Sequence, residues 1–394
     1  MADDQRMSEE QPSGDGAWLR RLNTSRVLQS LYPHAIKSVT QIAQDLALSR
    51  PTVVAAIKAL RERYLVAELP PQHQDTGRPP AMYQFRRNAG YLLGVQVAPD
   101  VIRVLLTDLT GEVTPQPDDN TVEPPIPRQH ERAVAEGASR TERLRTLEDA
   151  IVATLRSGGI TPEQVWAVVT STPGIVDSEG TVLVCGAIRD WTGDHLTTRL
   201  RRILPHPGCH IQVENDANLA AVAEHRARGN SRPANLVALL ADHRLGVGII
   251  AADAPHRGRG GRAGEIANQP ISPMADASKW LKKRKDDNPA AIVRAAARGH
   301  AESQKDVTTF VEHLALGLAT IVYTIDPDLI VIGGGLADAG SAIVDPLRER
   351  LDTLCRGREV PIEASTLGTQ AVPLGALHLA LDHAHHQMFT TTPR

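Results

Sequence analysis

Two adjacent polar residues, Asn215 and Asp216, stand where an apolar stretch gives way to a helical pattern. We expect a strand over His210–Val213 and a helix over Ala217–Arg228. A carboxylate and an amide at a strand end can form paired hydrogen bonds with vicinal hydroxyls of a small molecule. Alternatively, the pair is an Asx cap on the helix. The residues alone leave both readings open.

Positive charge is concentrated near the start of the chain. Residues 17–87, the head, contain 11 Lys and Arg but only four Asp and Glu, a net charge of +7. The whole chain carries −3, so the remainder carries −10. This asymmetry favours a head that meets a polyanion, although a solvated basic face is the alternative.

Three helical patterns follow one another in the head. They run over Trp18–Tyr32, over Ser38–Leu46 with Ser38 or Thr40 as its cap, and onward from Ser49. The third has its cap at Ser49 and a proline in its first turn, where a missing N–H costs nothing. We expect its buried stripe to comprise Val53, Val54, Ile57 and Leu60.

The two-residue link between the second and third patterns is typical of a helix-turn-helix, whose second helix enters the major groove. Met82–Phe85 is expected to return as a strand of a wing, with Arg78 at the wing's turn reaching a minor groove or phosphate. An ordinary three-helix bundle with a hairpin is the alternative. The candidate DNA contacts are Ser49, Arg50, Thr52, Ala55, Lys58 and Arg78.

The body of the chain alternates strand-like and helical runs, which predicts an α/β architecture with buried sheets. Residues 114–140 are expected to be a loop or insertion, and residues 1–16 and those from about Met388 to be disordered tails. A C-terminal helix is expected over about 373–386, with His383, His385 and His386 at its solvated end. The expected strands are 91–97, 102–108, 165–169, 210–213, 236–240, 246–251 and 329–332, and the expected helices 141–157, 198–203, 217–228, 290–297 and 307–325.

Several stretches in order resemble the ROK family (repressor, open reading frame, kinase). In the head these are LALSRPTVVAAIKALRERYLV and TGRPPAMYQF, with Val54 where serine is frequent. In the body they are STPGIVDSEGTVL (171–183), VENDANLAAVAEH, RGRGGRAGEIAN (257–268) and IDPDLIVIGGGLADAG (325–340). The resemblance implies a winged helix-turn-helix over 17–87 and, over 90–394, a two-lobed ribonuclease-H-like (actin-like, sugar-kinase) domain with its lobe boundary near 213.

The resemblance also implies roles for individual residues. Asp216 matches the general base of the family's kinases, and Glu265 matches their sugar-binding glutamate. Asn268 stands where the family has a histidine that ligates zinc and contacts sugar. The candidate effector-binding residues are therefore Asn215, Asp216, Glu265 and Asn268.

The phosphate-binding loop of the family's kinases, of the type Asp-x-Gly-Gly-Thr, is altered. Gln96 replaces the aspartate, Ala98 and Pro99 replace the glycines, and Asp100 replaces the threonine. Proline lacks an N–H, and neither replacement has the backbone freedom of glycine. A second loop has Leu245 where a hydroxyl is expected, whereas the glycine run 333–335 survives. Because phosphoryl transfer depends on positioning and charge neutralisation, we expect no kinase activity.

Metal, cofactor and membrane are not expected either. Cys185, Cys209 and Cys355 are widely spaced, which argues against a thiolate zinc site and a disulfide framework and fits a reducing cytoplasm. The opening residues are acidic and polar, unlike a secretory signal, and no apolar run approaches the roughly 20 residues of a membrane span.

The sequence thus predicts a cytoplasmic DNA-binding transcription regulator of carbohydrate metabolism, and we expect this regulator to be a repressor. Its expected partners are a double-stranded DNA operator, a sugar or sugar derivative as effector, and further copies of itself in a homodimer or homotetramer. An active ATP-dependent sugar kinase with an accessory head is the main alternative. A scaffold whose basic head binds an acidic protein is a third.

Overall fold

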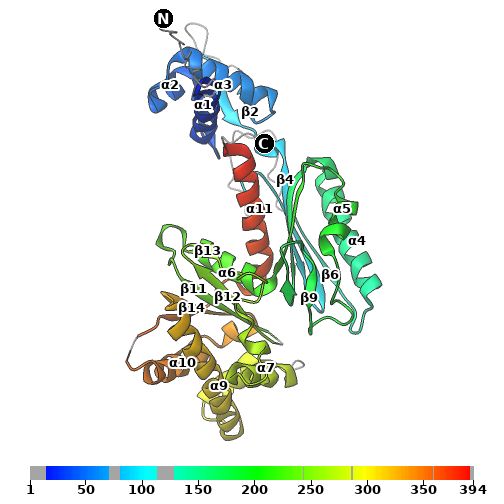
Figure 1. The fold of residues 1–394 in the computed structure, drawn as a ribbon, viewed down its shortest axis with the longest axis vertical. Helices are drawn as coiled ribbons and strands as arrows, with labels where there is room; N and C mark the ends of the chain where they lie inside the picture. The colour runs from blue at the N-terminus through cyan, green and yellow to red at the C-terminus, as the bar shows by residue number, and fades with distance from the viewer. Residues whose placement is uncertain are drawn as a thin grey trace, which may run out of the picture. The chain divides into compact units, whose positions relative to one another are not determined.

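The computed structural model describes residues 15–70, 80–112, 128–242, 244–284, 287–357 and 359–390. The chain forms two compact units (Figure 1). The head unit contains the residues up to Gly90, together with Asp108–Thr110 and the residues from Asp382 onward. The body unit contains Tyr91–Thr107 and Gly111–Leu381.

The head unit is a winged helix. Its three-stranded antiparallel sheet has the order β1-β3-β2, and three helices pack around one another beside it (Figure 1). Residues 71–79, which include Arg78, lie outside the described part of the wing. The elements are α1 (Asp15–Leu31), β1 (Ile36–Ser38), α2 (Val39–Leu46), α3 (Arg50–Glu62), β2 (Val66–Leu69), β3 (Met82–Phe85) and the 3₁₀ helix η1 (Arg87–Ala89).

Side-chain caps begin both helices of the helix-turn-helix, as the sequence predicts. The Ser38 hydroxyl accepts the Gln41 N–H at 3.3 Å, and the Gln41 side chain accepts the Ser38 N–H at 2.8 Å. The Ser49 hydroxyl accepts the Thr52 N–H at 3.3 Å. Ala47 adopts a left-handed conformation (φ 52°) that ends α2, so the chain can enter α3 after a short turn.

The predicted burial of α3 is wrong at one position. Val53, Ala56, Ile57 and Leu60 are buried, whereas Val54 is 52% exposed. Successive helical residues are rotated by about 100°, so two adjacent valines cannot both face the core. Val53 shares its face with Ile57 and Leu60, and Val54 is left on the outer face with the candidate DNA contacts.

The end of the chain completes the core of the head unit. Helix α11 (Ala371–Phe389) begins in the body unit and ends in the head unit. The Tyr32 ring meets His385 and Phe389 edge-on, with ring centroids 5.1 and 5.5 Å apart, and its hydroxyl lies 2.8 Å from His385 Nε2. Met388 is 2% exposed. The prediction of a solvated histidine run is therefore wrong at His385, whereas His386 is exposed as predicted. Met388 and Phe389, predicted to begin a disordered tail, belong to α11 instead.

The body unit contains two five-stranded sheets, one in each lobe (Figure 1). The first has the order β10-β7-β4-β5-β6, with β10, β7 and β4 parallel. It comprises β4 (Tyr91–Val97), β5 (Val101–Asp108), β6 (Arg128–Ala133), β7 (Val165–Thr172) and β10 (His210–Asn215), and a hairpin of β8 (Ile175–Val176) and β9 (Val182–Val184) lies apart from it.

The second sheet has the order β13-β12-β11-β14-β15. Helix α6 packs against β11 and β12, while α7 to α10 form the helical part of this lobe (Figure 1). Its strands are β11 (Leu236–Ala241), β12 (Leu245–Ala251), β13 (Ala254–Pro255), β14 (Leu329–Gly333) and β15 (Ile362–Ala364).

Helices of several lengths connect these strands, most of them close to the predicted ranges. The α-helices are α4 (Arg140–Gly158), α5 (Leu196–Ile203), α6 (Asp216–Ala227), α7 (Pro273–Lys283), α8 (Pro289–Ala297), α9 (Ala301–Ile325) and α10 (Ser341–Leu354). The 3₁₀ helices are η2 (Pro162–Gln164), η3 (Gly229–Ser231), η4 (Glu265–Asn268), η5 (Gly335–Ala339) and η6 (Gly368–Gln370).

Strand β6 corrects the prediction of an unstructured segment over 114–140. It pairs antiparallel with β5 from Leu106↔Arg128 to Val101↔Ala133. Polar residues such as Gln129 and Glu131 conceal it in the sequence. β6 is the edge strand of its sheet, so only one of its two sides pairs with another strand.

Helix α9 is long and apolar enough to cross a membrane by length and composition alone. Half of its apolar window is buried, and Phe310, Leu314 and Leu318 belong to the core of the second lobe. A core helix passes the same test, so its hydropathy is accounted for by packing.

Gly94 allows α11 to lie directly on β4 within the body unit. A Cβ atom at this position would stand 2.6 Å from the Pro373 carbonyl oxygen and 2.8 Å from the Leu377 nitrogen. Both atoms belong to the backbone and cannot move aside easily. The close approach of helix and strand therefore requires glycine.

Candidate functional site

Asn215 caps helix α6. Its side-chain oxygen accepts the N–H groups of Ala217 and Asn218 at 2.8 and 3.1 Å, and its amide nitrogen donates to the Gly174 carbonyl at 2.8 Å. The cap that the sequence left as an alternative is thus present. Because both ends of the amide are engaged, Asn215 positions the neighbouring carboxylate and the loop after β7.

Asp216 is the first residue of α6 and carries an unusual carboxylate. One oxygen accepts the Ala217 N–H at 2.8 Å. Burial raises the pKa of Asp216 from 3.8 to about 7, and the negative charges of Asp242 and Glu265 add to the effect. Near neutral pH this carboxyl group can therefore accept a hydrogen bond from a hydroxyl when it is ionised, or donate one when it is protonated.

Glu265 and Asn268 lie together on η4. The Asn268 amide donates to the Glu265 carboxylate. Burial raises the pKa of Glu265, and the hydrogen bond from Asn268 opposes that shift. Gly264 holds the turn in place: it has φ 85°, and a Cβ atom there would lie 2.1 Å from the Val247 carbonyl oxygen. The two predicted residues thus form one hydrogen-bonded pair.

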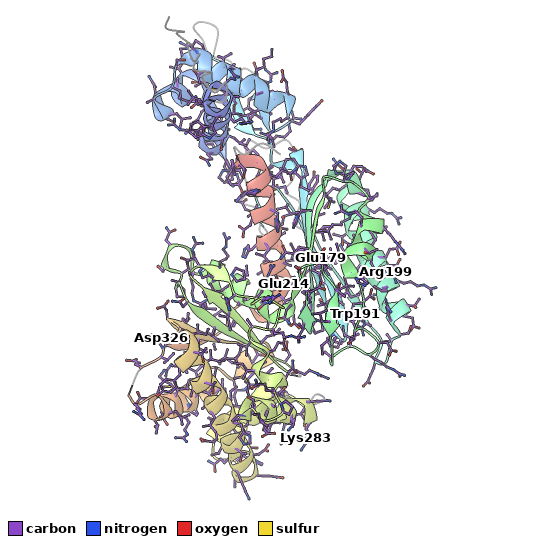
Figure 2. All side chains as sticks on the ribbon, viewed as in Figure 1. Glu179, Trp191, Arg199, Glu214, Lys283 and Asp326 are labelled. Atoms are coloured by element: carbon purple, nitrogen blue, oxygen red, sulfur yellow. The ribbon has the colours of Figure 1, made fainter. Side chains whose placement is uncertain are left out.

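Glu214 is a member of the site that the sequence reasoning missed. It is 4% exposed and pairs with the Arg257 guanidinium, and its other oxygen accepts the Asn215 N–H at 2.9 Å (Figure 2). Asn218 also donates to it, at 3.0 Å. A glutamate directly before Asn215 is the only sequence signal. The pair ties the loop after β13 to the end of β10.

In the turn between β4 and β5, a buried arginine binds two backbone carbonyl oxygens. Arg143 of α4 donates to the carbonyls of Ala98 and Pro99 at 2.7 and 2.8 Å. The Ala98 N–H is itself bonded to the Val101 carbonyl at 2.9 Å. Arg143 is 4% exposed, and burial lowers its pKa. The turn offers carbonyl oxygens to a cation, whereas a phosphate needs N–H donors.

The second loop and the glycine run both form hydrogen bonds with other groups of the chain. The Gly335 N–H in the glycine run donates to the Asp242 carboxylate at 2.6 Å. Arg244, at the tip of the β11–β12 hairpin, donates to the Gly186 carbonyl. The backbone N–H of Gly335 is thus already occupied by a carboxylate.

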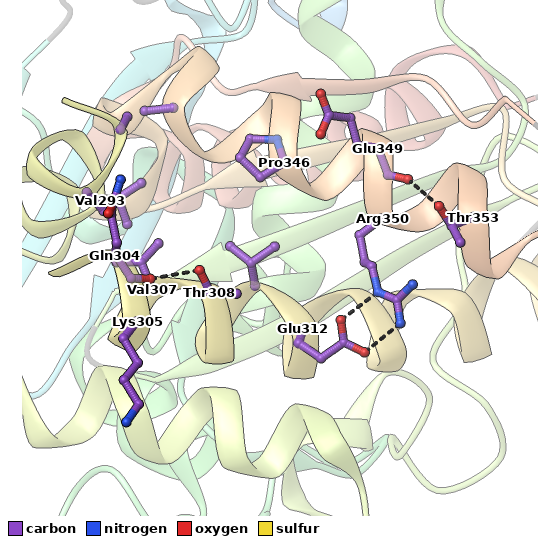
Figure 3. A pocket seen from close by; sticks show the side chains of 14 residues that line it. Val293, Gln304, Lys305, Val307, Thr308, Glu312, Pro346, Glu349, Arg350 and Thr353 are labelled. Atoms are coloured by element: carbon purple, nitrogen blue, oxygen red, sulfur yellow. Dashed lines mark hydrogen bonds and ion pairs between the residues drawn. The ribbon is translucent and has the colours of Figure 1, made fainter. Parts of the chain in front are cut away.

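Among the described residues, no group of three or more His, Cys, Asp or Glu side chains could hold a metal ion. A cavity of about 650 Å³ lies away from Asp216, between α8, α9 and α10 (Figure 3). It is crossed by a two-point ion pair between Glu312 and Arg350, with distances of 2.5 and 2.8 Å. Its lining includes none of the candidate effector-binding residues.

The candidate DNA-binding residues that the structure describes lie on α3 and its cap, whereas Arg78 is outside the described residues. Ser49, Arg50, Ala55 and Lys58 are exposed, and Thr52 is half-buried at the start of α3. Arg61 lies on the same helix but is paired with Glu68 of β2 at 2.8 Å. The outer face of α3 therefore presents two exposed cations, Arg50 in the first turn and Lys58 in the third turn.

Fold and site together define a two-domain class, in which a winged helix precedes a two-lobed α/β unit with an Asn-Asp pair at a strand end. The ROK family model matches residues 128–277 and 268–383. The chain belongs to the ROK family.

Curated relatives match nearly the whole chain. The xylose repressor of Caldicellulosiruptor bescii is 23% identical over 93% of this chain and 97% of its own length. The xylose repressor of Bacillus subtilis strain 168 is 21% identical over 94% of this chain and 97% of its own length. The glucokinase of Streptomyces coelicolor is 25% identical but covers only 60% of this chain.

Solved structures agree on the fold. A ROK family transcriptional regulator described as a homologue of the Escherichia coli MLC protein covers 94% of this chain and 98% of its own, with a TM-score of 0.65 and 18% identity. The ROK family glucokinase from Streptomyces griseus covers 74% of this chain, with a TM-score of 0.56 and 24% identity. The predicted combination of a winged head and a ROK domain is confirmed.

Proposed function

We propose that this protein is a DNA-binding transcriptional repressor of sugar metabolism. Relatives named xylose repressor match both of its units over almost their full length, which supports a repressor over an enzyme. The observation that carries the proposal is the pair of hydrogen bonds from Arg143 to the Ala98 and Pro99 carbonyls, which we call the Arg143 clamp. It occurs in a chain whose other unit is a basic winged helix. A turn whose carbonyl oxygens face a buried arginine is poorly suited to binding the phosphates of a nucleotide.

The effector in this proposal is a sugar or sugar derivative held by Asp216 and Glu265, with Asn268 orienting Glu265 and Asn215 orienting Asp216. Two carboxylates with raised pKa values can bond to neighbouring hydroxyls as acceptors or donors. Effector binding shifts the population of conformations of the body unit. Helix α11, which is shared by both units, carries that shift to the head unit.

The repressor acts in the cytoplasm as a homodimer or homotetramer on a two-fold related operator. Chromatin occupancy in cells identifies the operator, and gel-shift titrations with that duplex then test a panel of sugars that includes xylose. We expect one sugar to weaken DNA binding. In Asp216→Ala the operator affinity is kept and the sugar response is lost. Asp149→Ala, a change at an exposed residue of α4, serves as the matched control.

Unchanged induction in Asp216→Ala contradicts the effector site. A failure to retain any duplex DNA at low salt contradicts the repressor itself.

An active sugar kinase is the second candidate, because a carboxylate with a pKa of about 7 is suited to removing a proton from a sugar hydroxyl. A coupled assay of ATP consumption over the same sugar panel separates the two functions. We expect no turnover above the rate without sugar.

A further inference from the structure

Val54 is an exposed valine on the outer face of α3. Its side chain is 52% exposed, whereas Val53 beside it is fully buried. One turn before it stands Arg50 and one turn after it Lys58, both exposed, with the small residue Ala55 alongside. An apolar branched side chain is thus placed between two cations on the helix that a helix-turn-helix presents to DNA.

We propose that Val54 reads the methyl group of a thymine in the major groove. The inference rests on the proposed function, because it requires that α3 enters duplex DNA. Bases offer hydrogen-bond donors and acceptors in that groove, and the C5 methyl of thymine is the apolar group among them. Valine has no polar atom in its side chain, so it recognises this methyl by contact alone.

The position of Val54 along α3 fits a base contact. The first turns of a recognition helix approach base edges, and Val54 lies on the second turn, after the Ser49 cap. Arg50 and Lys58 flank it at i−4 and i+4 and can reach bases or phosphates on either side. Ala55 leaves room for the base pair to come close.

The surface next to Val54 favours nucleic acid as the occupant. Val54 borders a groove of about 770 Å³ between α3 and the strands β2 and β3. Arg61 in this groove pairs with Glu68, Arg86 lies over the Tyr64 ring, 5.6 Å from its centroid, and the exposed Lys58 and Glu62 complete the charged lining. With three cations and two carboxylates the groove keeps a net positive charge, which favours a phosphate backbone as the partner.

The test uses the full chain and duplexes selected from a random library. In the best-bound duplex each thymine is replaced in turn by deoxyuridine, which keeps the base pair and lacks only the methyl. For the unaltered protein we expect one thymine in each half-site at which the replacement weakens binding about fourfold, the effect of losing one buried methyl.

Val54→Ser removes both γ-methyls of the side chain and leaves a hydroxyl in their place. We expect this variant to bind the deoxyuridine and thymidine duplexes equally well at that position. Val152→Ser, a change at another exposed valine on α4, is the matched control and keeps the fourfold difference. Lys58→Ala weakens binding to all sequences alike and reduces the salt dependence by about one unit of slope.

The inference is overturned if no thymine replacement weakens binding, or if Val54→Ser keeps the full difference. It is also overturned if Val54→Ser changes the sedimentation coefficient, since Val54 would then cover a protein surface. A chain that selects no duplex at all removes the proposed function as well, so the two failures can be told apart.

Discussion

Replacing Asp216 by asparagine should stabilise the body unit, and the gain should depend on pH. Asparagine keeps the oxygen that accepts the Ala217 N–H and removes only the charge. The pKa of Asp216 is raised from 3.8 to about 7, chiefly by burial. Each unit of pKa shift corresponds to about 1.4 kcal/mol, so the ionised carboxylate destabilises the folded state by at most about 4 kcal/mol. Because Asp216 is only partly buried, we expect about 1–3 kcal/mol.

The raised pKa of Asp216 determines how the stability difference between the two proteins changes with pH. Below about pH 4 the carboxyl is protonated in both the folded and the unfolded chain, so its charge costs nothing. Between about pH 4 and 7 the unfolded chain releases the proton while the folded chain retains it, so the stability of the unaltered protein falls as pH rises. Above pH 7 the full cost is present. Asparagine does not titrate, and its advantage should grow across this window and then level off.

Thermal melts of the two proteins at pH 5, 6, 7 and 8 measure this difference. At roughly 2–4 °C per kcal/mol, we expect Asp216→Asn to melt about 2–10 °C higher at pH 8 and by clearly less at pH 5. Asp149→Asn, at an exposed position on α4, should give a flat difference. A melting difference for Asp216→Asn that is constant from pH 5 to 8, or that falls as pH rises, refutes the reasoning.

Three further substitutions test other parts of the structure. Arg50→Ala should weaken operator binding roughly tenfold in a gel shift, and full affinity would count against α3 as the recognition helix. Gly94→Ala should lower the unfolding free energy of the body unit by about 3 kcal/mol, because its Cβ meets the α11 backbone, and Gly260→Ala, with open space around it, should not. Tyr32→Ala should lower head-unit stability in melts by about 2 kcal/mol through the loss of its aromatic partners, whereas Tyr64→Ala, at a side chain 68% exposed, should change it little.

Local signals predicted much of the fold. Ser49 was identified as a cap, and Ser38 as one of two candidates with Thr40, because these residues stand where a helical pattern begins, and both serines do cap their helices. The strand over 91–97 was found in full because its residues are apolar on both faces. Val54 was misplaced because two adjacent valines fit a helical stripe equally well until the packing of α1 against α3 fixes which one is inside.

The candidate site was only partly accessible from the sequence. Asp216 and Glu265 were identified because they lie in the stretches VENDANLAAVAEH and RGRGGRAGEIAN, which resemble ROK family sequences. The Arg143 clamp was not, because it joins residues 44 and 45 positions apart, and no local pattern marks such a contact. Asp242 was missed for the same reason: its partner Gly335 is 93 residues away. The raised pKa of Asp216 depends on burial, which a sequence does not display.

The contribution of α11 to the head unit has a consequence for synthesis on the ribosome. Residues 15–90 emerge first, yet Tyr32 acquires Phe389 and His385 as neighbours only when the final helix has left the exit tunnel. At a synthesis rate of about 5–20 residues per second, the end of α11 follows the rest of the head unit only after many seconds. We therefore expect a polypeptide released early to have a less stable head unit, because Tyr32 lacks these two ring contacts.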